Sequence, residues 1–291
     1  MIDYFKNYIS KTKIGTFTKI LLLIIFYLFL SQSCMRMRMS STETSSYFKA
    51  AKITFIEKTI CFKNYNMHYV ESGSYNAQTV VFIHGSPGSW DAYKMYLRDS
   101  LLLKKYRLIA VDRPGFGHSN FGIAQDLKVQ TERMLAFIDT LQLKKPVIVV
   151  GHSLGGPLVL SMAAARTKMF RDVVVISGAV DPGLENPEKW RLVFMAKPIR
   201  YFVPGALRPS NDELWWLKND LVNLQPDLKK IQSTVTIIHG DKDRLVPYAN
   251  MKYMQLYLEN SKKTDTLTIK NADHFIPWSH FDIIRNKILQ L

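Results

Sequence analysis

The sequence predicts an α/β fold, in which helices cover both faces of a mostly parallel sheet. From residue 53 onward, short runs rich in β-branched residues alternate with longer stretches of helical periodicity, a pattern typical of parallel strands joined by helices. Residues 146–150 and 173–176 are continuously apolar, as expected of strands buried on both faces. With 291 residues, 47% of them apolar, the chain is long enough to bury one sizeable core.

The first half of the expected domain begins with a pair of antiparallel strands, residues 53–62 and 66–70. The elements that follow are a strand at 79–83, a helix at 90–103, a strand at 107–111 and a helix at 126–141. The last of these helices places its apolar residues near one face: Leu127, Met134, Leu135, Ile138 and Leu141.

The second half continues the alternation. We expect a buried strand at 146–150, a helix at 154–166, strands at 173–176, 235–238 and 266–269, and helices after residues 248 and 276. More than fifty residues without a buried strand separate two of these strands, which is too long for a plain connection. Residues 181–232 are therefore predicted to form a small helical lid, broken into short helices by prolines and rich in aromatic residues.

The N-terminus has the features of a bacterial export signal. Four lysines, at positions 6, 11, 13 and 19, precede an unbroken apolar run at 20–30, and small residues follow it. Residues 1–33 are thus predicted to be a signal peptide, and Cys34 lies where a bacterial lipoprotein carries its acylated cysteine. We expect an exported protein, either membrane-anchored through a lipid on Cys34 or free in the periplasm, with residues 34–50 as a polar tether.

The net charge of +15 does not indicate a nucleic-acid partner. Residues 1–33 carry four lysines and one aspartate, so the rest of the chain carries +12. Its lysines occur only as isolated residues or pairs, and no helix-turn-helix, zinc or RNA-binding pattern accompanies them. We interpret them as scattered solubilising charge. Cys34 and Cys61 are the only cysteines, so acylation of Cys34 would exclude an intramolecular disulfide.

A candidate nucleophile lies in the pentapeptide Gly151-His152-Ser153-Leu154-Gly155. This stretch fits G-x-S-x-G and has a predicted strand before it and a predicted helix after it, which is the context that the motif requires. The tight turn leaves little room for side chains at its two glycines. It places the serine hydroxyl at a helix N-terminus, where developing negative charge is favoured.

Two further stretches are characteristic of a known family: His84-Gly85-Ser86-Pro87-Gly88 and Asp112-Arg113-Pro114-Gly115-Phe116-Gly117. Together with the serine motif, they make the chain resemble the α/β-hydrolase superfamily, in its serine-hydrolase, esterase- or lipase-like branch. The resemblance implies an eight-stranded sheet and covers nearly all of the chain after the tether. It also implies that epoxide and haloalkane hydrolysis are disfavoured, because those members carry an aspartate at the position of Ser153.

In this family the histidine base follows the serine and the acid along the chain. Three histidines follow Ser153, and one of them, His239, ends the strand that should deliver the acid. His274 follows the last predicted strand, at the sheet edge where such sites form, whereas His280 falls within or beside the final helix. We therefore predict His274 as the base and His280 as a surface or capping residue.

The acid and the oxyanion hole are assigned by the resemblance. In His239-Gly240-Asp241-Lys242-Asp243, the second aspartate matches the family's triad acid, so Asp243 is the predicted acid and Asp241 a turn residue. The family's oxyanion hole uses the backbone N–H after the nucleophile, here that of Leu154, and one from the H-G-x-P-G loop, here that of Ser86. The Ser86 hydroxyl is expected either to assist or to cap the following helix.

The predicted function is cleavage of a carboxylic ester or related acyl bond through an acyl-enzyme, with no metal or organic cofactor. The substrate is expected to be a small molecule with an apolar group, because aromatic residues are concentrated in the lid. A thioesterase, an acyltransferase or a proline-iminopeptidase-like peptidase is an alternative on the same fold, although iminopeptidases typically carry Gly-Gly-Ser-Trp-Gly at the serine turn. A non-catalytic binding protein is a further alternative.

Overall fold

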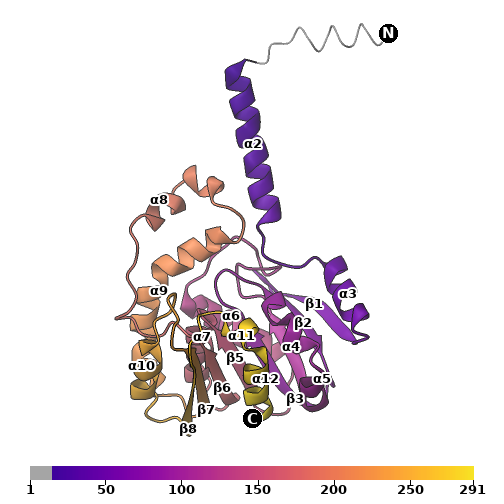
Figure 1. The fold of residues 1–291 in the computed structure, drawn as a ribbon, viewed down its shortest axis with the longest axis vertical. Coiled ribbons are helices and arrows are strands. Elements are labelled where there is room, and N and C mark those ends of the chain that lie inside the picture. Colours follow the sequence, from indigo (N-terminus) through magenta and orange to yellow (C-terminus); the bar gives the residue numbers. More distant parts are fainter. Residues whose placement is uncertain (1–14) are drawn as a thin grey trace.

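The computed structural model describes residues 15–291, without the side chains of Ser33 and Cys34. Its centre is an eight-stranded sheet in the order β1-β2-β4-β3-β5-β6-β7-β8 (Figure 1). The strands are β1 Phe55–Cys61, β2 Asn66–Ser72, β3 Gln78–Ile83, β4 Tyr106–Val111, β5 Val147–His152, β6 Phe170–Ile176, β7 Thr234–Gly240 and β8 Lys263–Ile269. β1 pairs antiparallel with β2, as predicted, and β2 with β4, whereas all other pairs are parallel.

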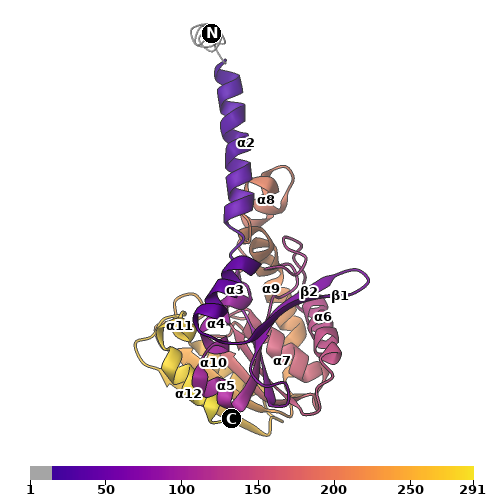
Figure 2. The same cartoon turned by 90° about the vertical axis from the view of Figure 1, so that its right-hand side faces the viewer.

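Helices cover both faces of this sheet and bury its apolar side chains in two clusters (Figures 1 and 2). One face packs against α6 Leu127–Thr140, α7 Gly155–Ala165, α9 Leu207–Leu228 and α10 Ala249–Tyr257. The other packs against η1 Trp90–Tyr93, α4 Lys94–Leu97, α5 Ser100–Lys105, α11 Ile276–Ser279 and α12 Phe281–Leu289. The predicted fold class is confirmed.

The single helix expected at 90–103 is three short helical segments instead: η1, α4 and α5. The side chain of Asp99 accepts hydrogen bonds from the backbone N–H groups of Leu101 and Leu102 at 3.0 and 2.9 Å. That cap begins a new helix at Ser100. The apolar residues keep their helical spacing across residues 90–103, but the chain there does not form one continuous helix.

The predicted polar tether at 34–50 is wrong for its second half, which forms helix α3, Ser41–Ala50. A capping box begins the helix: the Ser40 hydroxyl accepts from the N–H of Glu43, and the Glu43 carboxylate accepts from the N–H of Ser40. Phe48 is fully buried and stacks on Phe55, with ring centroids 4.6 Å apart. Burial of this aromatic ring, together with that of Thr44, makes α3 part of the domain.

Between β6 and β7, the segment predicted as a lid contains α8 Arg191–Met195, η2 Ile199–Phe202 and α9. α9 has 22 residues and is not broken by its prolines. Pro209 lies in its first turn, where no intrahelical N–H bond is needed, and Pro226 lies near its end. α9 buries a row of leucines against the domain, whereas α8 buries no side chain.

Helix α2, Thr16–Cys34, projects from the domain beside α8 and the lid (Figures 1 and 2). The predicted signal peptide, residues 1–33, includes all of this helix except Cys34; its residues 1–14 lie outside the described residues. The predicted acylation of Cys34 concerns a side chain outside the described part of the chain. Among residues 15–291, the structure contains no helix that is both long and apolar enough to cross a membrane.

Candidate active site

Ser153 lies on a sharp turn between β5 and α7, at the carboxyl edge of the sheet. Its φ is +54°, in the left-handed region that a residue with a side chain rarely adopts. A side chain at Gly151 would collide with the backbone of Gly155, and one at Gly155 would collide with the carbonyl of Ile83. The motif's glycines therefore permit a turn that presents the serine at the start of an 11-residue helix.

Asp243 and His274 meet at the same edge of the sheet, from the loops after β7 and β8. His274 Nδ1 lies 2.7 Å from Asp243 Oδ2, and both side chains are buried. With Nδ1–H donated to the carboxylate, the other ring nitrogen of His274 is left as a proton acceptor. The structure brings together the two residues that the sequence assigned to the acid and the base.

The carboxylate of Asp243 is held as an anion by its surroundings. Its Oδ1 accepts the N–H groups of Leu245 and Val246 at 2.9 and 2.8 Å, and His239 Nε2 lies 3.4 Å from Oδ2. Burial by itself would raise the pKa of Asp243. The hydrogen bonds from His239, His274 and the Val246 N–H outweigh burial and hold this pKa well below its usual range.

His152 is a site residue that sequence reasoning did not assign, although it lies inside the serine motif. Its Nε2 is 3.0 Å from the backbone carbonyl of His274, and the two rings are 4.7 Å apart. Burial, and then repulsion from His274, lower the pKa of His152 to about 3, so the neutral ring donates its Nε2–H to that carbonyl. His152 thereby ties the loop that carries His274 to the turn that carries Ser153.

A cavity of about 580 Å³ surrounds Ser153 and is called the serine pocket here. Ser153 and His274 both line it, and within residues 15–291 no hydrogen bond joins the two side chains. Such bonds are often long before a substrate is bound. The wall is largely apolar on the side formed by Ala179, Leu214, Leu217, Leu245, Val246, Phe275 and Trp278.

The exposed residues that line the serine pocket mark its mouth, and they are both apolar and polar, among them Met37, Glu188, Leu245 and Phe275. Several lining residues in this region were not suggested by the sequence. Glu185, Glu188 and Arg191 come from the start of the lid, and Met37 comes from the chain between α2 and α3. Burial raises the pKa of Glu185, with the Asp181 charge as a further cause. No sequence motif marks these lid residues or Met37, because only the folded chain places them beside Ser153.

The two predicted oxyanion donors both lie on the serine pocket. Within the described part of the chain, neither the Ser86 N–H nor the Leu154 N–H donates to another protein group. The Ser86 hydroxyl does not cap the following helix; it donates to the hydroxyl of Ser210 on α9, 2.9 Å away. Both backbone donors are thus free to bind a substrate oxygen.

A buried ion pair connects the lid to the loop that carries Ser86. Arg113 is fully buried and donates from both terminal nitrogens to the Glu213 carboxylate of α9, each at 2.9 Å. It also donates to the carbonyl of Gly85 at 3.0 Å. Arg113 belongs to the family motif at residues 112–117, which the sequence did not link to the site. Its contact with Glu213 forms only because α9 packs against the sheet.

The rejected alternatives have ordinary structural roles. The Asp241 carboxylate accepts the N–H of Asn271 at 2.6 Å, as expected of a turn residue. His280 lies at the N-terminus of α12, and its Nδ1 is 2.9 Å from the Ser279 hydroxyl.

Among residues 15–291, no group of three or more His, Cys, Asp or Glu side chains is arranged to hold a metal ion.

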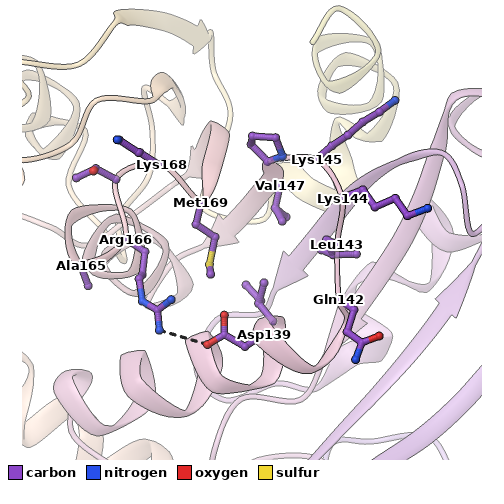
Figure 3. Close-up of a pocket in the computed structure, with 13 residues that line it drawn as sticks. Asp139, Gln142, Leu143, Lys144, Lys145, Val147, Ala165, Arg166, Lys168 and Met169 are labelled. Atoms are coloured by element: carbon purple, nitrogen blue, oxygen red, sulfur yellow. Dashed lines mark hydrogen bonds and ion pairs between the residues drawn. The ribbon is translucent and has the colours of Figure 1, made fainter.

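A second hollow lies at the amino end of β5 and is called the basal hollow here; its volume is about 660 Å³ (Figure 3). Residues 142–147 and 165–169 form most of its wall, together with Ile138 and Asp139. The side chains of Lys144, Lys145 and Lys168 extend outward from its rim in Figure 3, and Arg166 pairs with Asp139 at 3.2 Å.

The fold and the serine turn define a hydrolase of a known class. A family model described as the alpha/beta hydrolase family matches residues 80–283. Because this match spans more than half of the chain, the protein belongs to the alpha/beta hydrolase family and is a hydrolase.

Individual relatives are distant. The uncharacterized hydrolase YugF of Bacillus subtilis is 24% identical over 263 residues, which cover 77% of this chain and 93% of that protein. A serine hydrolase from the bacterium Cycloclasticus zankles has a similar structure, with a TM-score of 0.66, 16% identity and coverage of 81% and 97% of the two chains. A membrane phospholipase A aligns over 100% of this chain and 99% of its own, with a TM-score of 0.61 and 17% identity.

Proposed function

We propose that the protein is a serine hydrolase that cleaves a carboxylic ester or a related acyl bond through an acyl-enzyme. The observation that carries the proposal is the 2.7 Å contact between Asp243 and His274 on the pocket that also contains Ser153. An acid–histidine pair beside a serine on a strained turn is the arrangement needed to activate a hydroxyl at neutral pH.

In the proposed reaction, His274 takes the proton of the Ser153 hydroxyl as its oxygen attacks the substrate carbonyl. The N–H groups of Ser86 and Leu154 bind the oxyanion, and Asp243 stabilises the protonated imidazole. His274 then returns the proton to the leaving group. A water molecule, deprotonated by His274, attacks the acyl-enzyme; the bond to Ser153 breaks, His274 returns the proton to the Ser153 oxygen, and the acid is released.

The wall of the serine pocket supports an apolar acyl or alcohol group in the substrate. Leu214, Leu217 and Val246 form part of an apolar wall that would bury such a group beside the serine. We expect the rate on esters of one alcohol to rise with acyl chain length until the pocket is full. A screen of esters by chain length measures this directly.

Labelling with a fluorophosphonate probe tests the proposal. We expect the probe to label the folded protein and not a Ser153→Ala variant, since the probe requires an activated serine. Equal labelling of both proteins, or no labelling of either, would contradict the proposed chemistry. Thioester, amide and alcohol-acceptor assays on the labelled enzyme would then distinguish hydrolysis of esters from thioesterase, peptidase or acyltransferase activity.

We also propose that the protein works at a membrane outside the cytoplasm. The basic, apolar N-terminus supports export, and two routes lead to attachment: acylation of Cys34 after cleavage, or retention of α2. The mass of the mature protein from the membrane fraction separates them, because only the first route removes residues 1–33 and adds a lipid. A full-length or cleaved protein found only in the soluble fraction would contradict this part of the proposal.

A further inference from the structure

Helix α2 is joined to the lid by specific hydrogen bonds. The Tyr27 hydroxyl donates to the carbonyl of Phe202 at 3.0 Å, and the Gln32 amide donates to the carbonyls of Tyr201 and Val203 at 3.1 and 3.0 Å. The N–H of Gly205 donates to the Ser31 carbonyl at 3.1 Å. Cleavage after residue 33 would remove every one of these α2 partners from the lid.

The surface that these contacts create is apolar and exposed. On the lid, the side chain of Trp190 is 49% exposed, and Leu192, Val193, Phe194, Ile199 and Tyr201 are exposed to a similar degree. On α2, Phe26 is 59% exposed, and most of the apolar side chains from Phe17 to Leu30 are also exposed. The rings of Tyr27 on α2 and Phe202 on η2 stack with their centroids 6.5 Å apart, and α8 adjoins η2 on the same side of the domain (Figures 1 and 2). The exposed apolar side chains of these three helices are called the α2–lid face here.

The charges of the two segments that form the α2–lid face are all positive, although acidic neighbours pair with two of them. No aspartate or glutamate occurs between residues 4 and 42 or between residues 189 and 203. The described cations of these two segments are Lys19, Arg36, Arg38, Lys189, Arg191, Lys197 and Arg200. Arg191 is paired with Glu188 and Arg200 with Asp212, so the basic rim consists mainly of the lysines. An apolar face with a basic rim is complementary to a bilayer that contains anionic phospholipid, whereas a soluble protein partner would need matching acidic groups.

The α2–lid face adjoins the mouth of the serine pocket. Arg191, the first residue of α8, and Met37, which follows α2, both line that pocket. A bilayer in contact with the face would therefore meet the opening through which a substrate reaches Ser153.

We propose that α2 and the segment from Trp190 to Phe202 together form a docking face for an anionic phospholipid bilayer, which brings the mouth of the serine pocket to the lipid surface. The substrate would then be an acyl lipid taken from that surface, a consequence that rests on the proposed function. Docking itself requires only the α2–lid face and does not depend on the proposed function.

An environment-sensitive dye at the lid tests the proposal in the full-length chain. The background carries Cys34→Ser and Cys61→Ser, which removes both native thiols and any acylation. The dye is attached through Phe194→Cys, and in a matched control through Leu256→Cys, an exposed position on α10. With phosphatidylcholine–phosphatidylglycerol vesicles, we expect the emission at position 194 to shift to the blue and the emission at position 256 to stay unchanged. Vesicles without phosphatidylglycerol should bind about tenfold more weakly.

Two results would overturn the proposal. If the protein floats with the vesicles while position 194 shows no shift, α2 binds lipid alone and the lid does not dock. A blue shift at position 194 without vesicles that grows with protein concentration would mean that a second copy covers the face. Fluorophosphonate labelling of Ser153 in the same samples is independent of docking, so its loss would count against the proposed function and not against the face.

Neutralising two lysines of the basic rim provides a second test of the proposal. A Lys189→Gln, Lys197→Gln variant should lose most of its preference for vesicles with phosphatidylglycerol and keep its rate on a soluble ester, because neither lysine lines the serine pocket. An unchanged lipid preference would contradict the charge argument.

Discussion

The two ends of β5 carry hollows of similar volume and different chemistry. The serine pocket has about 580 Å³ and the basal hollow about 660 Å³. At the serine pocket, three histidines and an aspartate are buried and hydrogen-bonded to one another or to the backbone. At the basal hollow, the charged groups are lysines on the rim and an exposed ion pair between Arg166 and Asp139 (Figure 3). Volume alone does not identify a site.

The difference follows from the direction of the strands. In a parallel sheet the carboxyl ends of β5, β7 and β8 meet at one edge, and the loops after them converge on the same point. The N-terminus of α7 also lies there and favours negative charge. At the amino ends the chain arrives from helices, and its lysines remain solvated, where they are worth little to stability.

The largest expected effect is the loss of the nucleophile. Ser153→Ala should lower kcat on an ester by about 10⁶-fold, because the proposed attack has no other nucleophile in the serine pocket. Kinetics on the purified variant measure it, with circular dichroism to establish that the fold is intact. If the variant kept more than a hundredth of the wild-type rate, Ser153 would not be the nucleophile, and the serine pocket would no longer differ from the basal hollow as a reactive site.

Asp243→Asn should be the next most damaging change. It keeps the shape of the side chain but no longer stabilises the protonated form of His274, so we expect kcat to fall by about 10⁴-fold. Asp241→Asn is the matched control two residues away and should have little effect on kcat. If the two variants behaved alike, the assignment of the acid would be wrong.

Glu213→Ala should destabilise the fold more than any surface change. It leaves the fully buried Arg113 guanidinium without its carboxylate, which costs about 3 to 5 kcal/mol. Urea unfolding measures the free energy of unfolding. Glu213→Gln, which retains an acceptor for Arg113 but not the charge, should recover part of it; a stability equal to that of the wild type would show that the charge is unimportant.

Stability should fall in mild acid because of the serine-pocket end of the molecule. Burial lowers the pKa of His84 and of His152 to about 3, against an ordinary value near 6.5. The unfolded chain therefore takes up protons that the folded chain does not. Their contribution is complete above about pH 6.5 and decreases as the pH falls toward 3, by about 2 kcal/mol for each histidine at pH 5.

Thermal unfolding at pH 7 and pH 5 measures this loss. A His152→Gln variant keeps a donor for the His274 carbonyl and should show a clearly smaller drop in Tm between the two pH values. An equal drop in both proteins would place the acid sensitivity elsewhere.

The smallest effect is expected at the basal hollow. Lys145→Ala with Lys168→Ala should change the free energy of unfolding by no more than about 0.5 kcal/mol and leave kcat unchanged, because both side chains are exposed. A substantial loss of activity would mean that the basal hollow takes part in the reaction, and the comparison would fail.

Sequence reasoning succeeded where a local pattern has one structural outcome. The alternation of apolar runs and helical stretches predicted the sheet, and the order Ser153, Asp243, His274 predicted which loops would converge. It failed where packing decides. The capping box at Ser40 was present in the sequence, but tertiary packing, chiefly of Phe48 on Phe55, makes α3 part of the domain. Likewise, the Asp99 side chain caps the start of α5, so a new helix begins where the apolar periodicity predicted one continuous helix.

What the sequence by itself determined is the geometry of the serine turn, because that depends on steric demands within a few residues. The tertiary structure decided how His152 holds the His274 loop, how Arg113 joins the lid to the Ser86 loop, and how α2 lies against the lid. These contacts join residues from 28 to 175 positions apart. No periodicity or motif encodes such distances; they arise only when the sheet has assembled and its covering helices pack on it.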